Sequence, residues 1–140
     1  MHPFRRAVEE RDEKGIQAML ADTVVFTSPV AFKPYVGKPI TAAILRGVLR
    51  IFEGFHYIRE IHDPGGHDHA FVFETGVAGA PGVKITGCDF LHFNDDGLID
   101  DFMVMVRPLS GATALSEAMG AQFGRIQQEA LELANQSGTA

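Results

Sequence analysis

The segment Val83–Pro108 constrains the fold most, because it predicts two strands joined by a tight turn. Both arms are rich in β-branched and aromatic residues, and the sequence Asn94-Asp95-Asp96-Gly97 between them is typical of a hairpin turn. Side chains alternate along a strand, so Ile85, Asp89 and Leu91 share one face. An acid therefore lies within an otherwise apolar row.

Asp89 is the first candidate functional residue. The opposite face of its strand carries Thr86, Cys88 and Phe90, so we expect the strand to be covered on both sides. An ionised carboxylate in such a place is costly unless it has a partner, and a raised pKa or a dedicated set of donors is the usual consequence. We predict a catalytic or ligand-binding role. The alternative is a structural acid bonded to backbone amides or a hydroxyl.

Length, charge and cysteine content exclude several classes of protein. The 140 residues fit one domain, and a formal charge of -6 argues against a nucleic-acid partner, which needs a basic surface. A single cysteine, Cys88, predicts no internal disulfide and a cytoplasmic setting. The charged residues 1–14 do not resemble a signal peptide, and no apolar run approaches the ~18 residues of a membrane span.

The order of elements predicts an α+β fold with a curved, mainly antiparallel sheet, the N-terminal helices covering one face. We expect residues 1–134 to form a single domain and residues 135–140 a disordered tail. The elements expected from periodicity and turn residues are a helix from Pro3, a helix at 16–20, strands at 23–28, 55–62, 69–76, 83–93 and 98–108, a loop at 29–37, and helices at 39–52 and 113–134.

The second face of the sheet is expected to be apolar as well. Cys88, Phe90, Met103 and Met105 fall in the phase opposite to Asp89, where a solvated sheet would carry polar residues. An exposed apolar face usually marks an interface, so we predict a homodimer through the outer sheet face. Asp101 and Arg107 share this phase and are expected to pair there.

The element order and local sequence resemble the nuclear transport factor 2-like superfamily of cone-shaped α+β barrels, in particular its SnoaL-like cyclase and ketosteroid-isomerase branches. The resemblance covers about residues 3–108. Its most specific segment is Asp89–Ile99, and a second match runs from Ala21-Asp22 through the strand Thr23–Ser28 to Pro29-Val30 and Gly37. This fold hosts isomerases, cyclases, dehydratases, epoxide hydrolases and non-enzymatic binding proteins.

The resemblance assigns roles residue by residue. Asp89 falls where the isomerases keep a protonated Asp that donates to an oxyanion, and where SnoaL-like cyclases have an acid–base Asp. The isomerase general base corresponds to Ser28, and no Tyr precedes Tyr35 to match the catalytic Tyr of the first helix. We therefore do not expect steroid double-bond isomerisation. The epoxide-hydrolase arrangement is not expected either, because Asp100 and Asp101 lie near the hairpin end.

The expected function is that of a small-molecule pocket protein that uses no cofactor and no metal. It would be an acid/base enzyme of isomerase, cyclase or dehydratase type acting on an apolar carbonyl-bearing or polycyclic compound, with Asp89 assisted by Ser28 or Tyr57. The alternative is a ligand-binding or accessory module without chemistry, and plain core is the alternative for the lining. The expected substrate-binding residues are Phe26, Tyr35, Phe71, Phe73, Thr75, Leu91, Phe102 and Val104.

A histidine cluster offers a different hypothesis. His67-x-His69 followed by Glu74 resembles the metal motif of cupins, but a regular strand would place His69 and Glu74 on opposite faces. The alternative is a solvated hairpin with pH-sensitive charge. The sequence leaves the roles of His62, His67 and His69 open.

Overall fold

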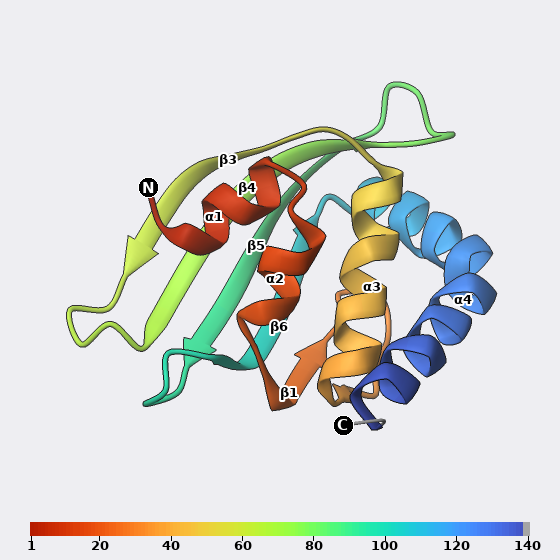
Figure 1. Ribbon diagram of the computed structural model, residues 1–140. Helices are drawn as coiled ribbons and strands as arrows, with labels where there is room; N and C mark the ends of the chain where they lie inside the picture. The colour runs from red at the N-terminus through yellow and green to blue at the C-terminus, as the bar shows by residue number, and fades with distance from the viewer. Residues whose placement is uncertain (139–140) are drawn as a thin grey trace.

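The computed structural model describes residues 1–138, in which a curled, unclosed sheet holds helices against its concave side (Figure 1). The six strands follow the order β2-β1-β6-β5-β4-β3, and all neighbours are antiparallel except β1 and β6. This confirms the predicted α+β class. The elements are α1 Pro3–Glu9, α2 Glu13–Ala18, β1 Leu20–Thr27, β2 Tyr35–Val36, α3 Lys38–Ile51, β3 Phe52–His62, β4 Asp68–Val77, β5 Lys84–Phe93, β6 Ile99–Arg107 and α4 Leu109–Gly138.

The predicted hairpin is formed by β5 and β6. Its turn is held by Asn94, whose side-chain oxygen accepts from the backbone N–H groups of Asp96 at 2.9 Å and Leu98 at 3.0 Å. Gly97 has a φ of 76°, the left-handed region that glycine adopts without strain. The register pairs Asp89 with Val104, which fixes the acid in the middle of the sheet.

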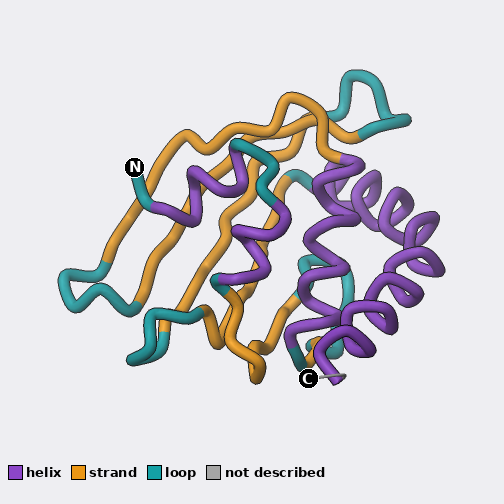
Figure 2. Tube along the Cα trace, in the orientation of Figure 1, coloured by secondary structure: helices purple, strands orange, loops and turns teal. Residues whose placement is uncertain are grey.

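Two pairs of helices lie on the concave side of the sheet. Figure 2 shows α1 and α2 lying across the strands, while α3 and α4 pack side by side next to them. Buried apolar residues on one side of α3 face the sheet, and Gly47 on α3 lets Ile126 of α4 approach closely. Arg50 joins the same two helices by donating to Gln122 at 2.9 Å and Glu129 at 3.2 Å. The site is thus enclosed by helices from both ends of the chain.

Several predicted boundaries move for local reasons. The segment expected to be a loop at 29–37 contains the short strand β2, anchored where the Gly37 N–H donates to the Val24 carbonyl at 2.8 Å. Helix α2 begins at Glu13 rather than Ile16, because the Asp12 side chain accepts from the Gly15 N–H and caps it. The expected tail at 135–140 is helical as far as Gly138, and residues 139–140 lie outside the described part.

The outer sheet face is apolar and partly open. Phe90 is 38% exposed and Met105 53%, while Cys88 and Met103 are half-buried. Asp101 and Arg107 lie exposed at the two ends of β6 on the same face. Within residues 1–138, no helix combines the length and apolar character that a membrane crossing requires.

Gly87 gives the first testable prediction, because the ring of Phe73 lies directly on it. A Cβ at position 87 would overlap this ring, whereas a Cβ at the exposed helical position Gly124 would meet nothing within 4 Å. Gly87→Ala should therefore lower the free energy of unfolding by about 1–3 kcal/mol, through overpacking. Gly124→Ala, the matched control, should raise it by about 0.5–1 kcal/mol. Urea denaturation measures both, and an unaltered Gly87→Ala protein would contradict this packing.

Candidate active site

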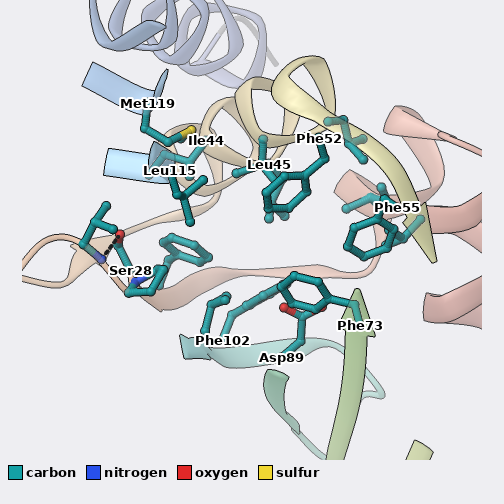
Figure 3. Close-up of a pocket in the computed structure, with 18 of the residues that line it drawn as sticks. Ser28, Ile44, Leu45, Phe52, Phe55, Phe73, Asp89, Phe102, Leu115 and Met119 are labelled. Atoms are coloured by element: carbon teal, nitrogen blue, oxygen red, sulfur yellow. Dashed lines mark hydrogen bonds between the residues drawn. The ribbon is translucent and has the colours of Figure 1, made fainter. Parts of the chain in front are cut away.

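A cavity of about 70 Å³ lies between the concave sheet face and helices α1 to α4 (Figure 3). The helices contribute apolar side chains such as Phe4, Leu45 and Leu115, and the sheet contributes aromatic rings. Among the described lining residues, the only polar side chains are those of Ser28, Tyr57 and Asp89. These are the same three residues that the sequence singled out as catalytic candidates.

Asp89 and Tyr57 form one buried pair. Asp89 projects from the centre of β5 and is 6% exposed, while Tyr57 projects from β3 and is 4% exposed. The Tyr57 hydroxyl donates to Asp89 Oδ2 at 2.6 Å, across the intervening strand β4. The Tyr57 ring also contacts Phe71 and Phe73 of that strand, with centroid distances of 5.8 and 6.2 Å. Aromatic packing therefore fixes the direction in which the hydroxyl points.

The electrostatics of the pair follow from its burial. Loss of water raises the pKa of Asp89 to about 7, and the hydrogen bond from Tyr57 opposes this rise by favouring the ionised form. Burial, together with the nearby carboxylate of Asp89, raises the pKa of Tyr57 well above its usual value. Near neutral pH, Tyr57 is therefore a neutral donor, and Asp89 populates both protonation states.

Ser28 occupies a different part of the cavity. It follows the last residue of β1, and its Oγ accepts from the Val30 N–H at 3.1 Å, which holds the loop at the cavity rim. Figure 3 shows Ser28 at one end of the cavity, with Phe102 between it and Asp89. A serine hydroxyl that accepts from backbone still has its own proton to donate. Ser28 is thus placed to contact a ligand at a second point.

Four of the eight expected substrate-binding residues line the cavity, namely Phe26, Phe73, Phe102 and Val104. The other four do not, although three of them are buried on the predicted face. The Thr75 hydroxyl donates to the Gly76 carbonyl at 2.9 Å, and the Tyr35 ring lies 6.3 Å from that of Phe123. The remaining two, Phe71 and Leu91, are buried in the core, Phe71 beneath Phe4 of α1.

The helical half of the lining was not predicted as part of the site. It includes Phe4 and Val8 from α1, Leu45 from α3, and Leu115 and Met119 from α4. Alternation along strands identifies only the sheet side of a cavity. The apolar stripes of the helices carried the missing signal, because a helix over the concave face must turn its apolar side toward the sheet.

The histidine cluster does not form the suspected metal motif. His62 Nδ1 lies 2.6 Å from His69 Nδ1, and His62 Nε2 lies 3.0 Å from Glu60 Oε1. His67 is instead bonded to the Phe93 carbonyl at 2.8 Å. Across the described residues, no group of three or more His, Cys, Asp or Glu side chains is arranged to hold a metal ion. The expected absence of a cofactor and a metal stays a prediction.

The protein is of the α+β class and encloses one buried acid in an apolar cavity. Comparison with known proteins identifies its family. Residues 2–102 match the family model of the SnoaL-like domain, so the chain belongs to this family, within the nuclear transport factor 2-like superfamily. The predicted membership is confirmed.

Solved structures agree with this assignment. A steroid delta-isomerase from Pseudomonas aeruginosa shares 38% identity over 89% of both chains, with a TM-score of 0.80. An uncharacterised protein with a cystatin-like fold from Silicibacter pomeroyi shares 34% identity over 86% of this chain and 82% of its own, with a TM-score of 0.78. A putative polyketide cyclase from Xanthomonas campestris, at 15% identity, 81% and 92% coverage and a TM-score of 0.64, shows the fold alone. No curated protein matches the chain.

The raised pKa of Asp89 predicts an unusual dependence of stability on pH. The folded state holds this proton more tightly than the unfolded state, where the pKa is ~3.9. The contribution of protonated Asp89 to the free energy of unfolding should therefore be complete below pH 4. The free energy of unfolding should fall by about 4 kcal/mol as pH rises from 4 through 7. Asp89→Asn should lose this fall, so that it matches the wild type at pH 4 and exceeds its stability at pH 8.

Urea denaturation across this pH range measures the effect. Asp22→Asn, which removes an exposed carboxyl from β1, is the matched control and should follow the wild-type curve. Parallel curves for Asp89→Asn and the wild type would show that the carboxyl is not held in a protonated state.

Proposed function

We propose that the protein is a cofactor-independent acid/base enzyme acting on a small, mostly apolar compound that carries a carbonyl group. One observation carries the proposal: a buried carboxyl with a pKa of about 7 faces an apolar cavity and is bonded to a neutral hydroxyl. A group that populates both protonation states at neutral pH is suited to general acid/base catalysis. A cofactor is not needed for proton transfer next to a carbonyl.

The carbonyl oxygen of a bound ligand would meet the pair formed by Asp89 and Tyr57. In its neutral form Asp89 donates a hydrogen bond to the oxygen, so negative charge that develops there is stabilised. The single proton of the Tyr57 hydroxyl stays on the other oxygen of Asp89 and holds the carboxyl in place. In its ionised form Asp89 accepts a proton from the carbon next to the carbonyl. The apolar lining keeps water out and strengthens both interactions. Ser28 would hold a second polar atom of the ligand.

The neighbour named as a steroid delta-isomerase supports a reaction of isomerase type. The resemblance to the isomerases nevertheless places Ser28 where they carry their general base, so we do not propose the same double-bond isomerisation. The cavity of about 70 Å³ holds only a few water molecules. A compound smaller than a steroid, or movement of flexible side chains such as Met119, is required.

A second candidate function is ligand binding without chemistry. It is favoured by one feature: Asp89 and Tyr57 are the only titratable groups among the described lining residues. Reactions that need a separate acid and base would find only one carboxyl in the cavity. This candidate predicts that a ligand binds and is released unchanged.

Hydrogen exchange at carbon distinguishes the two functions, because it requires proton transfer but no particular product. A panel of apolar ketones, cyclic and polycyclic, would be incubated with the protein in heavy water and followed by proton NMR. We expect exchange next to the carbonyl of at least one ketone, slowed at least about 100-fold in Asp89→Asn, in line with the usual contribution of a general acid or base.

The control for this experiment is Asp22→Asn, whose exposed carboxyl lies outside the cavity and which should exchange as fast as the wild type. Exchange at the wild-type rate in Asp89→Asn would exclude Asp89 as the proton-transfer group. Binding of a ketone without exchange would favour the ligand-binding module.

We also propose that the outer sheet face pairs with a second copy of the chain. In a two-fold interface each surface meets itself, so residue i contacts j and j contacts i. Asp101 and Arg107 lie at opposite ends of β6, so two antiparallel copies of this strand would bring each acid next to the other copy's arginine. Phe90, Met103 and Met105 would then be buried between them.

The predicted cytoplasmic setting stays a prediction.

Light scattering tests the homodimer. Phe90→Glu places a charge in the apolar centre of the face and should convert a dimer into a monomer, because burying an unpaired carboxylate is costly. Leu131→Glu, at a 67% exposed apolar residue of α4, is the control and should remain a dimer. A monomeric wild type would refute the proposed pairing.

A further inference from the structure

Strand β3 lies at an edge of the sheet, so within residues 1–138 the backbone groups that face away from β4 have no neighbouring strand to pair with. At Tyr57, helix α1 supplies the missing partners. Arg5 Nη2 donates to the Tyr57 carbonyl at 3.1 Å, and the Tyr57 N–H donates to Glu9 Oε2 at 3.3 Å. Two side chains, one helical turn apart, therefore hold both backbone groups of the residue whose hydroxyl reaches Asp89.

This two-point attachment is braced by ion pairs. Arg5 Nε lies 3.2 Å from Glu9 Oε1, and Arg5 Nη1 lies 2.8 Å from Glu60 Oε2 on β3. The side chains are between 16% and 26% exposed, so water is partly excluded from the contacts. All three nitrogens of the guanidinium are used, each in a different direction. The planar fork of arginine provides this geometry, and the single ammonium of lysine does not.

The attachment falls where the sheet itself holds Tyr57 least well. The pairing of β3 with β4 is irregular between Glu53 and His56 and again between Tyr57 and Arg59. Tyr57 is thus flanked by two breaks in the ladder, and its position depends more on contacts from outside the sheet than that of a residue in a regular strand.

We infer that Arg5 and Glu9 are positioning residues, which hold the Tyr57 backbone so that its hydroxyl stays on Asp89. Their significance for catalysis rests on the proposed function. Neither side chain lines the cavity, whereas Phe4 and Val8 of the same helix do. Helix α1 therefore both closes the cavity and fixes Tyr57, the hydrogen-bond donor to Asp89.

The test is the pKa of the Asp89 carboxyl, followed by carbon-detected NMR titration of the full, ligand-free chain. The hydrogen bond from Tyr57 lowers this pKa, so Tyr57→Phe should raise it. Glu9→Leu should raise it in the same direction, because the hydroxyl is no longer held in place. Loss of a negative charge would by itself lower the pKa of Asp89, so the sign separates positioning from simple electrostatics.

Matched controls are available at the C-cap of the same helix and at position 9 itself. Glu10→Leu removes an exposed acid one residue away and should not raise the pKa. Glu9→Gln keeps an oxygen that accepts from the Tyr57 N–H and should restore a value near the wild type. In the Tyr57→Phe background, Glu9→Leu should cause no further rise, since no hydroxyl remains to be positioned.

An unchanged or lowered pKa in Glu9→Leu, alongside a raised pKa in Tyr57→Phe, would overturn the inference. So would an unchanged pKa in Tyr57→Phe. If Glu9→Leu does not fold, Arg5→Lys replaces it, because it keeps the charge but loses the fork, and it should also raise the pKa. The titration uses no substrate, so a positive result with no ketone exchange would refute the proposed function and leave the positioning role standing.

Discussion

The hydrogen bond between Tyr57 and Asp89 is the interaction on which the character of this molecule depends. It satisfies one oxygen of a carboxyl that the fold has removed from water, at the centre of an apolar surface. Removal from water alone would keep the carboxyl protonated across the neutral range, and the hydroxyl moderates this. The chemistry available to the cavity is set by the balance between these two effects.

The sheet and the helices together produce both the burial of Asp89 and its contact with Tyr57. The curled sheet brings β3 and β5 close enough for a tyrosine to reach across β4, and the helices seal the concave side. Gly87, beside Asp89 on the same strand, leaves the space that the Phe73 ring occupies. A side chain there would displace this ring, which lines the same cavity as Asp89. The contact between Gly87 and Phe73 therefore belongs both to the packing of the core and to the wall of the site.

The sequence predicted the sheet side of the molecule well, because alternation along strands assigns each residue to a face. Asp89, Phe73 and Phe102 lie on the predicted inner face and in the cavity. Phe71 and Leu91 share that face without reaching the cavity, since alternation gives the face but not the height at which helices leave space. The contact of Tyr57 with Asp89, across an irregular edge strand, requires the three-dimensional arrangement.

The parallel pairing of β1 with β6 joins an early segment of the chain to a late one. Such a contact forms slowly, because a long loop must close before it contributes. Phe26 on β1 and Leu115 on α4 both line the cavity, so its wall is built from segments far apart in the sequence. In the unfolded chain Asp89 is hydrated, and its carboxyl has an ordinary pKa. The raised pKa is therefore a property of the assembled fold, to which segments from both ends of the chain contribute, and not of the residue itself.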